Sequence, residues 1–179
     1  RQRQMCIRDR GKGEGTGVRG RIGIPFGLNM YENLPFWFTF FTKLNFEVVL
    51  SPESSRKLYI KGQHTIPSDT VCYPAKLLHG HVEALVEEGV DAIWYPCMSY
   101  NNDDGIGDNH FNCPVVAYYP ELLAANVPAL KQTKFLNPYV GLWRHKDFAK
   151  RIAKMMEEEF SIPKKESVAA AKAAYEAYD

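Results

Sequence analysis

Short apolar runs alternate with helical stretches along most of the chain. The runs predict strands at residues 22–25, 46–50, 91–96 and 115–118. Apolar residues at helical spacing, together with cap signals, predict helices at residues 29–43, 51–61, 74–88, 120–126, 146–160 and 164–178. Residues 135–140 fit either kind of element. Because strands that alternate with helices are typical of βαβ units, we expect a doubly wound α/β fold, with a mostly parallel sheet and helices on both faces.

Local signals mark several helix ends. Asn29 followed by Glu32 matches a capping box, in which two side chains satisfy free backbone N–H groups. Pro74 fits the first position of a helix, and Gly89 ends that helix. The aromatic run at residues 36–41 favours a helix that is buried all round. A groove for a substrate or partner is the alternative for this run.

The first twenty residues have no apolar periodicity. They contain the run QMCIRDR, which resembles the translation of sequencing-adapter DNA, so we expect residues 1–20 to be a non-native or disordered leader. The leader holds six basic and two acidic residues, and the formal net charge of +1 becomes negative without it. The basic surface that nucleic-acid binding requires is therefore not expected.

The remaining residues 21–179 are enough for a single α/β domain with one core. The last helical stretch has no stop signal, so we expect a fragment of a larger protein. No apolar run reaches the roughly 18 residues of a membrane span, and no membrane partner is expected. Charged residues at 24% and apolar residues at 45% are ordinary for a globular protein.

Three cysteines lie outside the leader, at Cys72, Cys97 and Cys113. Their odd number and the lack of a signal peptide argue against a disulfide scaffold and indicate a reducing compartment, which places the protein in the cytoplasm. In that setting a thiol is either buried as a small apolar group or used as a ligand or nucleophile.

Cys72 and Cys97 occupy positions that suit a metal site. Cys72 lies just ahead of the helix that begins near Pro74, where the helix dipole favours a thiolate. Cys97 directly follows the strand at residues 91–96, at the edge where ligand sites of open α/β sheets gather. A right-handed crossover would bring both thiols to that edge. The alternative for Cys72 is a buried free cysteine.

Cys113 is harder to place because it precedes the strand predicted at residues 115–118. It would then lie at the opposite edge, unless the loop that starts at Met98 folds back. A metal site made of Cys97, His110 and Cys113 is an alternative that the H-x-x-C spacing permits.

Polar residues near Cys72 could surround such a site. The candidates are Tyr73, Lys76 and His79, with His110 near Cys113. A helix places His79 and His81 about 200° apart, so the two cannot share one ligand face. We expect one of these histidines to face the region of Cys72 and the other to face solvent, or both to be hydrogen-bonded surface residues.

Several familiar motifs are absent from the chain. The turn at residues 23–27, GIPFG, does not match G-x-G-x-x-G, and the chain contains no G-x-x-x-x-G-K-[ST], so we expect no dinucleotide or ATP site in this fragment. It also lacks G-x-S-x-G and H-E-x-x-H, which weakens any assignment as a hydrolase.

Six ordered blocks carry a resemblance to a known family: IGIPFGLNMYENLPFWFTFF, SSRKLY, TIPSDTVCYPAKLLHGH, YPCMSYN, DNHFNCPVV and YPELL. They resemble the uncharacterised domain of the CoA-substrate-specific enzyme activase family, which is related to activators of 2-hydroxyglutaryl-CoA dehydratase. The resemblance implies a layout similar to that of the dehydratase subunits, which bind a [4Fe–4S] cluster through cysteines at loop-to-helix and strand-end positions. Cys72 and Cys97 match those positions. Cys113 stands in an NCP motif that belongs to the activase-related domain itself.

The resemblance therefore implies an iron–sulfur domain of anaerobic metabolism, with Cys72 and Cys97 as ligands. Cys113 is a candidate for the third ligand, which the resemblance itself does not assign. Its role would be low-potential electron transfer or the radical dehydration of a 2-hydroxyacyl-CoA, without catalysis by this domain alone. Its partners would be other domains of the same large activator protein and an acyl-CoA dehydratase. Two alternatives stay open: a cluster-free module that docks through its aromatic surface and C-terminal helix, and a zinc-stabilised structural domain.

Overall fold

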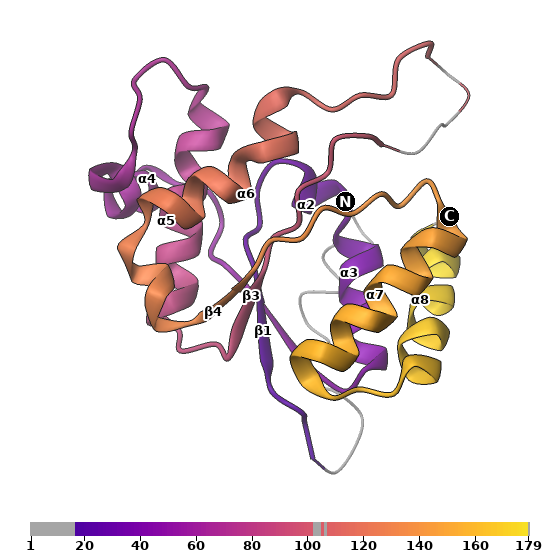
Figure 1. The fold of residues 1–179 in the computed structure, drawn as a ribbon. Coiled ribbons are helices and arrows are strands. Elements are labelled where there is room, and N and C mark those ends of the chain that lie inside the picture. Colours follow the sequence, from indigo (N-terminus) through magenta and orange to yellow (C-terminus); the bar gives the residue numbers. More distant parts are fainter. Residues whose placement is uncertain (1–16, 102–104, 106, 179) are drawn as a thin grey trace.

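The computed structural model of the chain describes residues 17–101, 105 and 107–178. These residues form a four-stranded parallel sheet with helices on both faces, which confirms the predicted doubly wound α/β fold (Figure 1). The strands are β1 (Arg21–Ile24), β2 (Glu47–Leu50), β3 (Ala92–Trp94) and β4 (Lys134–Leu136). The helices are α2 (Asn29–Glu32), α3 (Leu34–Lys43), α4 (Arg56–Gly62), α5 (Tyr73–Glu87), α6 (Pro114–Asn126), α7 (His145–Phe160) and α8 (Lys164–Tyr178), with 3-10 turns η1 (Gln63–Thr65) and η2 (Pro128–Gln132).

The strand order β2-β1-β3-β4 determines where a ligand can approach the sheet. Helices α3, α7 and α8 lie on one face and α4, α5 and α6 on the other, so the chain changes face between β1 and β3 (Figure 1). All neighbouring strands pair in parallel, and the loops that follow them therefore meet at one carboxyl edge. Binding sites of doubly wound sheets form at this edge.

The aromatic run of α3 lies in the core. Phe36, Trp37, Phe40 and Phe41 are fully buried. The ring of Trp37 packs 5.0 Å from that of Trp94 on β3. Each such side chain contributes about 1.5–3 kcal/mol through its burial. The alternative of an aromatic groove is therefore wrong.

Helix α8 covers the aromatic helix and is itself part of the core. Tyr175 of α8 packs edge-on against Phe36, with ring centroids 4.9 Å apart. Its hydroxyl donates a hydrogen bond to the backbone oxygen of Leu142 at 2.7 Å. A docking surface made of the α3 aromatic residues is thus not available to a partner. None of the helices in the described ranges has the length and apolar composition of a membrane span.

The predicted strand at residues 115–118 is instead the first turn of α6. Valine and tyrosine favour strands, but Pro114 occupies the first helical position, where its fixed φ and missing N–H fit. The helix predicted at residues 120–126 exists but begins earlier, since α6 starts at Pro114 and continues through Pro120 at the cost of one helical hydrogen bond.

The predicted capping box at Asn29 does not form. The residue before α2 is Leu28, with a φ of 48°, and no side chain caps the helix. Asn29 donates its amide instead to the Met98 sulfur at 3.5 Å, and Asn33, which separates α2 from α3, donates to the same sulfur at 3.6 Å. These bonds join the loop after β1 to the loop after β3.

Helices α4 and α5 cross in direct contact at two glycines. A Cβ atom on Gly80 would overlap the backbone oxygen of Leu58, and one on Gly62 would overlap the backbone of Gly80. The two helix backbones approach this closely because neither glycine carries a side chain. The crossing fixes the height of α5, and hence of its amino end, relative to the sheet.

We predict that Gly80→Ala lowers the free energy of unfolding by about 2 kcal/mol or more, because the helices must separate to admit the methyl group. Urea denaturation measures this change. Gly107→Ala is the matched control, since open space surrounds that position, and it should change stability by less than about 0.5 kcal/mol. Equal effects of the two substitutions would contradict the close crossing.

Candidate functional site

Cys72 and Cys113 occupy equivalent positions at the starts of two helices. Cys72 is the residue before α5, and Cys113 is the residue before α6. Both are exposed, and neither sulfur caps its helix through a hydrogen bond. Because residues 115–118 are helical, Cys113 lies in the connection between β3 and α6. It therefore belongs to the carboxyl edge, and not to the opposite edge that the predicted strand implied.

Cys97 lies at the end of β3, as the sequence predicted, but it is fully buried. Its backbone N–H donates to Pro138 and its carbonyl accepts from Val140, in a parallel bridge that extends the pairing of β3 and β4. Burial, and secondarily the charge of Glu121, raise the pKa of the Cys97 thiol to about 11, while the backbone of Glu121 opposes this shift by a hydrogen bond. At neutral pH the Cys97 thiol is protonated.

All three thiols lie around helix α6. Cys113 starts the helix, and the sulfur of Cys97 lies against Glu121 on it. Burial raises the pKa of Tyr119, also on α6, to about 12, and the nearby thiol of Cys72 raises it further. Figure 1 shows α6 crossing over the middle of α5. One helix thus connects the three cysteines that lie outside the leader.

The buried hydroxyl of Tyr95 completes this neighbourhood. Tyr95 is fully buried beside Cys97 and Tyr119, and burial raises the pKa of its hydroxyl well above the usual value. Within the described part of the chain, this hydroxyl has no hydrogen-bond partner. A buried hydroxyl without a partner is costly, so the site has an unused donor next to a thiol.

The thiols do not converge on one point in the described structure. Among the described residues, no three histidine, cysteine, aspartate or glutamate side chains lie close enough together to hold a metal ion. The alternative of a zinc site made of Cys97, His110 and Cys113 is therefore not formed. His110 belongs to the loop after β3, where its ring lies 5.9 Å from that of Tyr100.

His79 and His81 are both fully buried, so the expectation that one or both face solvent is wrong. The ring of His79 is hydrogen-bonded to Thr65 at 2.7 Å and to Tyr119 at 2.8 Å. The ring of His81 is bonded to Ser51 at 2.7 Å and to a second serine, Ser54, at 3.0 Å. Both ring nitrogens of each histidine are thus engaged, which leaves none for a metal.

Tyr73 and Lys76 lie close to Cys72 but make structural contacts. The ring of Tyr73 packs 5.4 Å from that of Tyr59. Lys76 donates from Nζ to the backbone oxygen of Asp69 at 2.8 Å and so holds the loop that leads to Cys72. Neither side chain contacts a thiol through a hydrogen bond in the described structure.

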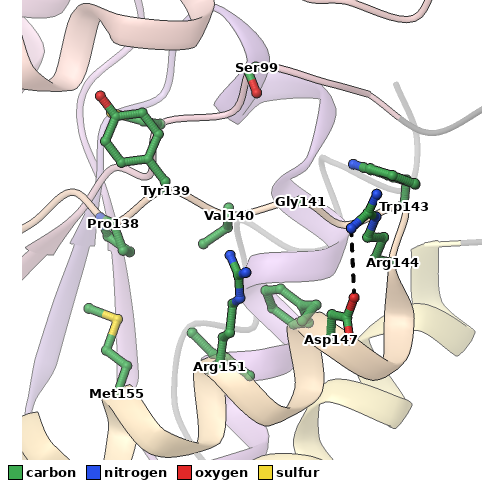
Figure 2. Close-up of a pocket in the computed structure, with 13 residues that line it drawn as sticks. Ser99, Pro138, Tyr139, Val140, Gly141, Trp143, Arg144, Asp147, Arg151 and Met155 are labelled. Atoms are coloured by element: carbon green, nitrogen blue, oxygen red, sulfur yellow. Dashed lines mark ion pairs between the residues drawn. The ribbon is translucent and has the colours of Figure 1, made fainter.

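A pocket of about 510 Å³ opens beside Cys97, between the segment after β4 and helix α7 (Figure 2). Its lining includes two arginines, Arg144 and Arg151. Sequence reasoning missed both. Arg144 and Arg151 are seven residues apart, a spacing that places both near the same face of a helix. The sequence did not show that this face lies beside residues 135–140, because that segment could not be assigned to a strand.

Comparison with known proteins gives one match. The family model described as a CoA enzyme activase uncharacterised domain matches residues 21–179. Comparison with curated proteins and with solved structures found no match.

We predict that the protein loses stability as the pH falls below about 6.5. Burial lowers the pKa of both His79 and His81 from 6.5 to about 4, and the charge of His64 adds to the effect on His79. Between pH 6.5 and about pH 4, the two histidines therefore bind protons in the unfolded chain but not in the folded chain. Stability is complete above the unfolded pKa and falls toward pH 4, by roughly 3 kcal/mol for each histidine. Urea denaturation at a series of pH values measures this loss.

His81→Gln should remove about half of the pH-dependent loss, because one of the two buried rings is gone. His145→Gln is the control for the loss of a histidine side chain at an exposed position, and it is measured over the same series of pH values. A pH dependence that is the same in wild type and His81→Gln would contradict the assignment of buried neutral rings.

Proposed function

Because the chain belongs to the family of CoA enzyme activase uncharacterised domains, we propose that it supplies thiolate ligands to a [4Fe–4S] cluster in such an activase. The observation that carries the proposal is the placement of Cys72, Cys97 and Cys113 around α6 at the carboxyl edge. The cluster would take one electron from a reduced, low-potential donor domain and pass it to an acyl-CoA dehydratase.

The two exposed cysteines fit the role of cluster ligands. Each precedes a helix whose free backbone N–H groups and dipole stabilise negative charge, as a thiolate and a cluster carry. Neither Cys72 nor Cys113 is committed to a cap bond. Both can therefore bind iron without losing an existing contact.

Cys97 can act as a cluster ligand only if its thiol loses its proton. Its thiol is protonated and buried, so iron must displace the proton, as metal coordination of a thiol does. Cluster loading should therefore release a proton from this residue. The desolvation that disfavours a bare Cys97 thiolate is offset once the sulfur is bonded to iron.

Tyr95 supports a sulfur-rich ligand at this place. Its buried hydroxyl, which has no partner among the described residues, can donate to a cluster sulfide or to a thiolate. Hydrogen bonds to sulfur raise the reduction potential of a cluster. Tyr95 would thus tune the potential as well as satisfy its own donor.

Cluster binding would have to bring the thiols closer together. The described side chains do not gather three ligands around one point. A further ligand would come from another domain of the activase or from a partner protein.

We predict that the anaerobically purified chain binds iron and sulfide on reconstitution and gains the visible absorption of a cluster. Cys72→Ser, Cys97→Ser and Cys113→Ser should each lose most of the bound iron, because removing one thiolate weakens a shared centre. Cys6→Ser is the matched control, since Cys6 lies outside both the described residues and the family match, and it should keep the iron. The proposal would be overturned if the wild-type protein holds no iron. It would also be overturned if a variant with all three cysteines replaced by serine holds as much iron as the wild type.

A further inference from the structure

We propose that the pocket between residues 138–144 and helix α7 binds a small organic anion, in which one carboxylate or phosphate group is carried on an apolar body. Cys97, a proposed cluster ligand, lies at the wall of this pocket, but the inference does not depend on iron. Three features of the pocket indicate such a ligand: its shape, the state of its two arginines and its apolar floor.

The pocket lies where a doubly wound sheet places ligands. It opens at the carboxyl ends of β3 and β4, between the segment that follows β4 and the first turns of α7 (Figure 2). Its volume of about 510 Å³ falls within the range of small-molecule sites. A pocket of this size has room for an organic body attached to an anionic group.

Arg151 is the first reason to expect an anion. Its guanidinium extends from α7 toward Val140, across the mouth of the pocket (Figure 2). Ten ion pairs join charged side chains of the described residues, and Arg151 takes part in none of them. A guanidinium carries a planar fork of N–H donors that matches a carboxylate or a phosphate. Arg151 therefore keeps this fork available.

Arg144 supplies the second positive charge. It lies over the ring of Trp143, with its guanidinium carbon 4.1 Å from the ring centroid. Its ion pair with Asp147 is loose, at 4.0 Å between Nη1 and the carboxylate, and exposed pairs of this kind are weak. Arg144 and Arg151 together outweigh Asp147 by one positive charge. The balance favours a ligand with one anionic group.

The start of α7 adds donors to the same corner. Arg144 itself precedes α7, and no side chain caps this helix. The first backbone N–H groups of the helix can therefore donate hydrogen bonds to an anion. This contribution supports the arginines and would not define a site alone.

The floor of the pocket explains why the ligand needs an apolar body. Phe148 and Ile152 are buried side chains of α7 that line it, and Met155 extends the lining toward Pro138 (Figure 2). A hydrated inorganic ion gains nothing from such a surface. An alkyl or acyl chain that covers it gains about 25 cal/mol for each Å² of apolar area removed from water.

Calorimetric titration of the full, iron-free chain tests this proposal with three probes: hexanoate, hexyl phosphate and inorganic phosphate. We expect saturable binding of at least one of the two alkyl probes and weaker binding of inorganic phosphate. The ratio of the two alkyl affinities identifies the preferred head group. The proposal would be overturned if neither alkyl probe binds saturably. It would also be overturned if inorganic phosphate binds as tightly as hexyl phosphate.

Arg151→Gln should weaken binding of the alkyl probe about tenfold or more, because a charge-assisted bidentate contact is lost. Lys150→Gln is the matched control: it removes an equal charge from the adjacent exposed position, which does not line the pocket, and should leave the affinity unchanged. Equal affinities in the two variants would contradict the role of Arg151. Cys72→Ser should bind the probe like wild type, so failure of the cluster proposal leaves this result intact.

Discussion

The parallel pairing of β3 with the segment after β4 determines the geometry of the whole carboxyl edge. Beyond the last residue of β3, the backbone of Cys97 continues to bond to Pro138 and Val140. This bridge buries the Cys97 thiol beneath α6 and at the same time fixes the segment that forms one wall of the pocket. The proposed thiol site and the pocket, which meet at Cys97, thus share a single set of backbone hydrogen bonds.

Helix α5 carries the second constraint, through the sequence His79-Gly80-His81. Gly80 permits close contact with α4, and the two histidines on either side of it bond in different directions. His79 reaches Tyr119 on α6, and His81 reaches Ser51 at the end of β2. The motif that suggests metal binding in the sequence therefore ties α5 to its neighbours. The amino end of α5, with Cys72, is held in place by these bonds.

Most of the fold follows from local sequence signals, because a buried central strand and long amphipathic helices leave clear patterns. The positions of Cys72 and Cys97 could be predicted for the same reason, since each depends only on the element next to it. The assignment of residues 115–118 failed where β-branched and aromatic residues occupy a helix whose burial depends on distant partners. The capping box predicted at Asn29 failed for a similar reason, because the hydrogen-bond partner of the Asn29 side chain is Met98 on another loop.

The burial of Cys97, the unused hydroxyl of Tyr95 and the orientation of Arg151 all depend on contacts between elements far apart in the chain. No periodicity or spacing in the sequence reports such contacts. These contacts leave the Cys97 thiol buried and protonated, whereas the thiols of Cys72 and Cys113 are exposed. A pocket lined by two arginines lies beside Cys97.

The central claim is that three thiols at one sheet edge hold a single inorganic centre. Mössbauer spectroscopy of protein reconstituted with isotopically enriched iron tests it most directly, because the spectrum distinguishes a cluster from scattered iron. We expect the signal of a [4Fe–4S] cluster in the wild-type chain, and we expect it to disappear when Cys72 and Cys113 are both replaced by serine. A spectrum that contains only isolated high-spin iron in the wild-type chain would contradict it.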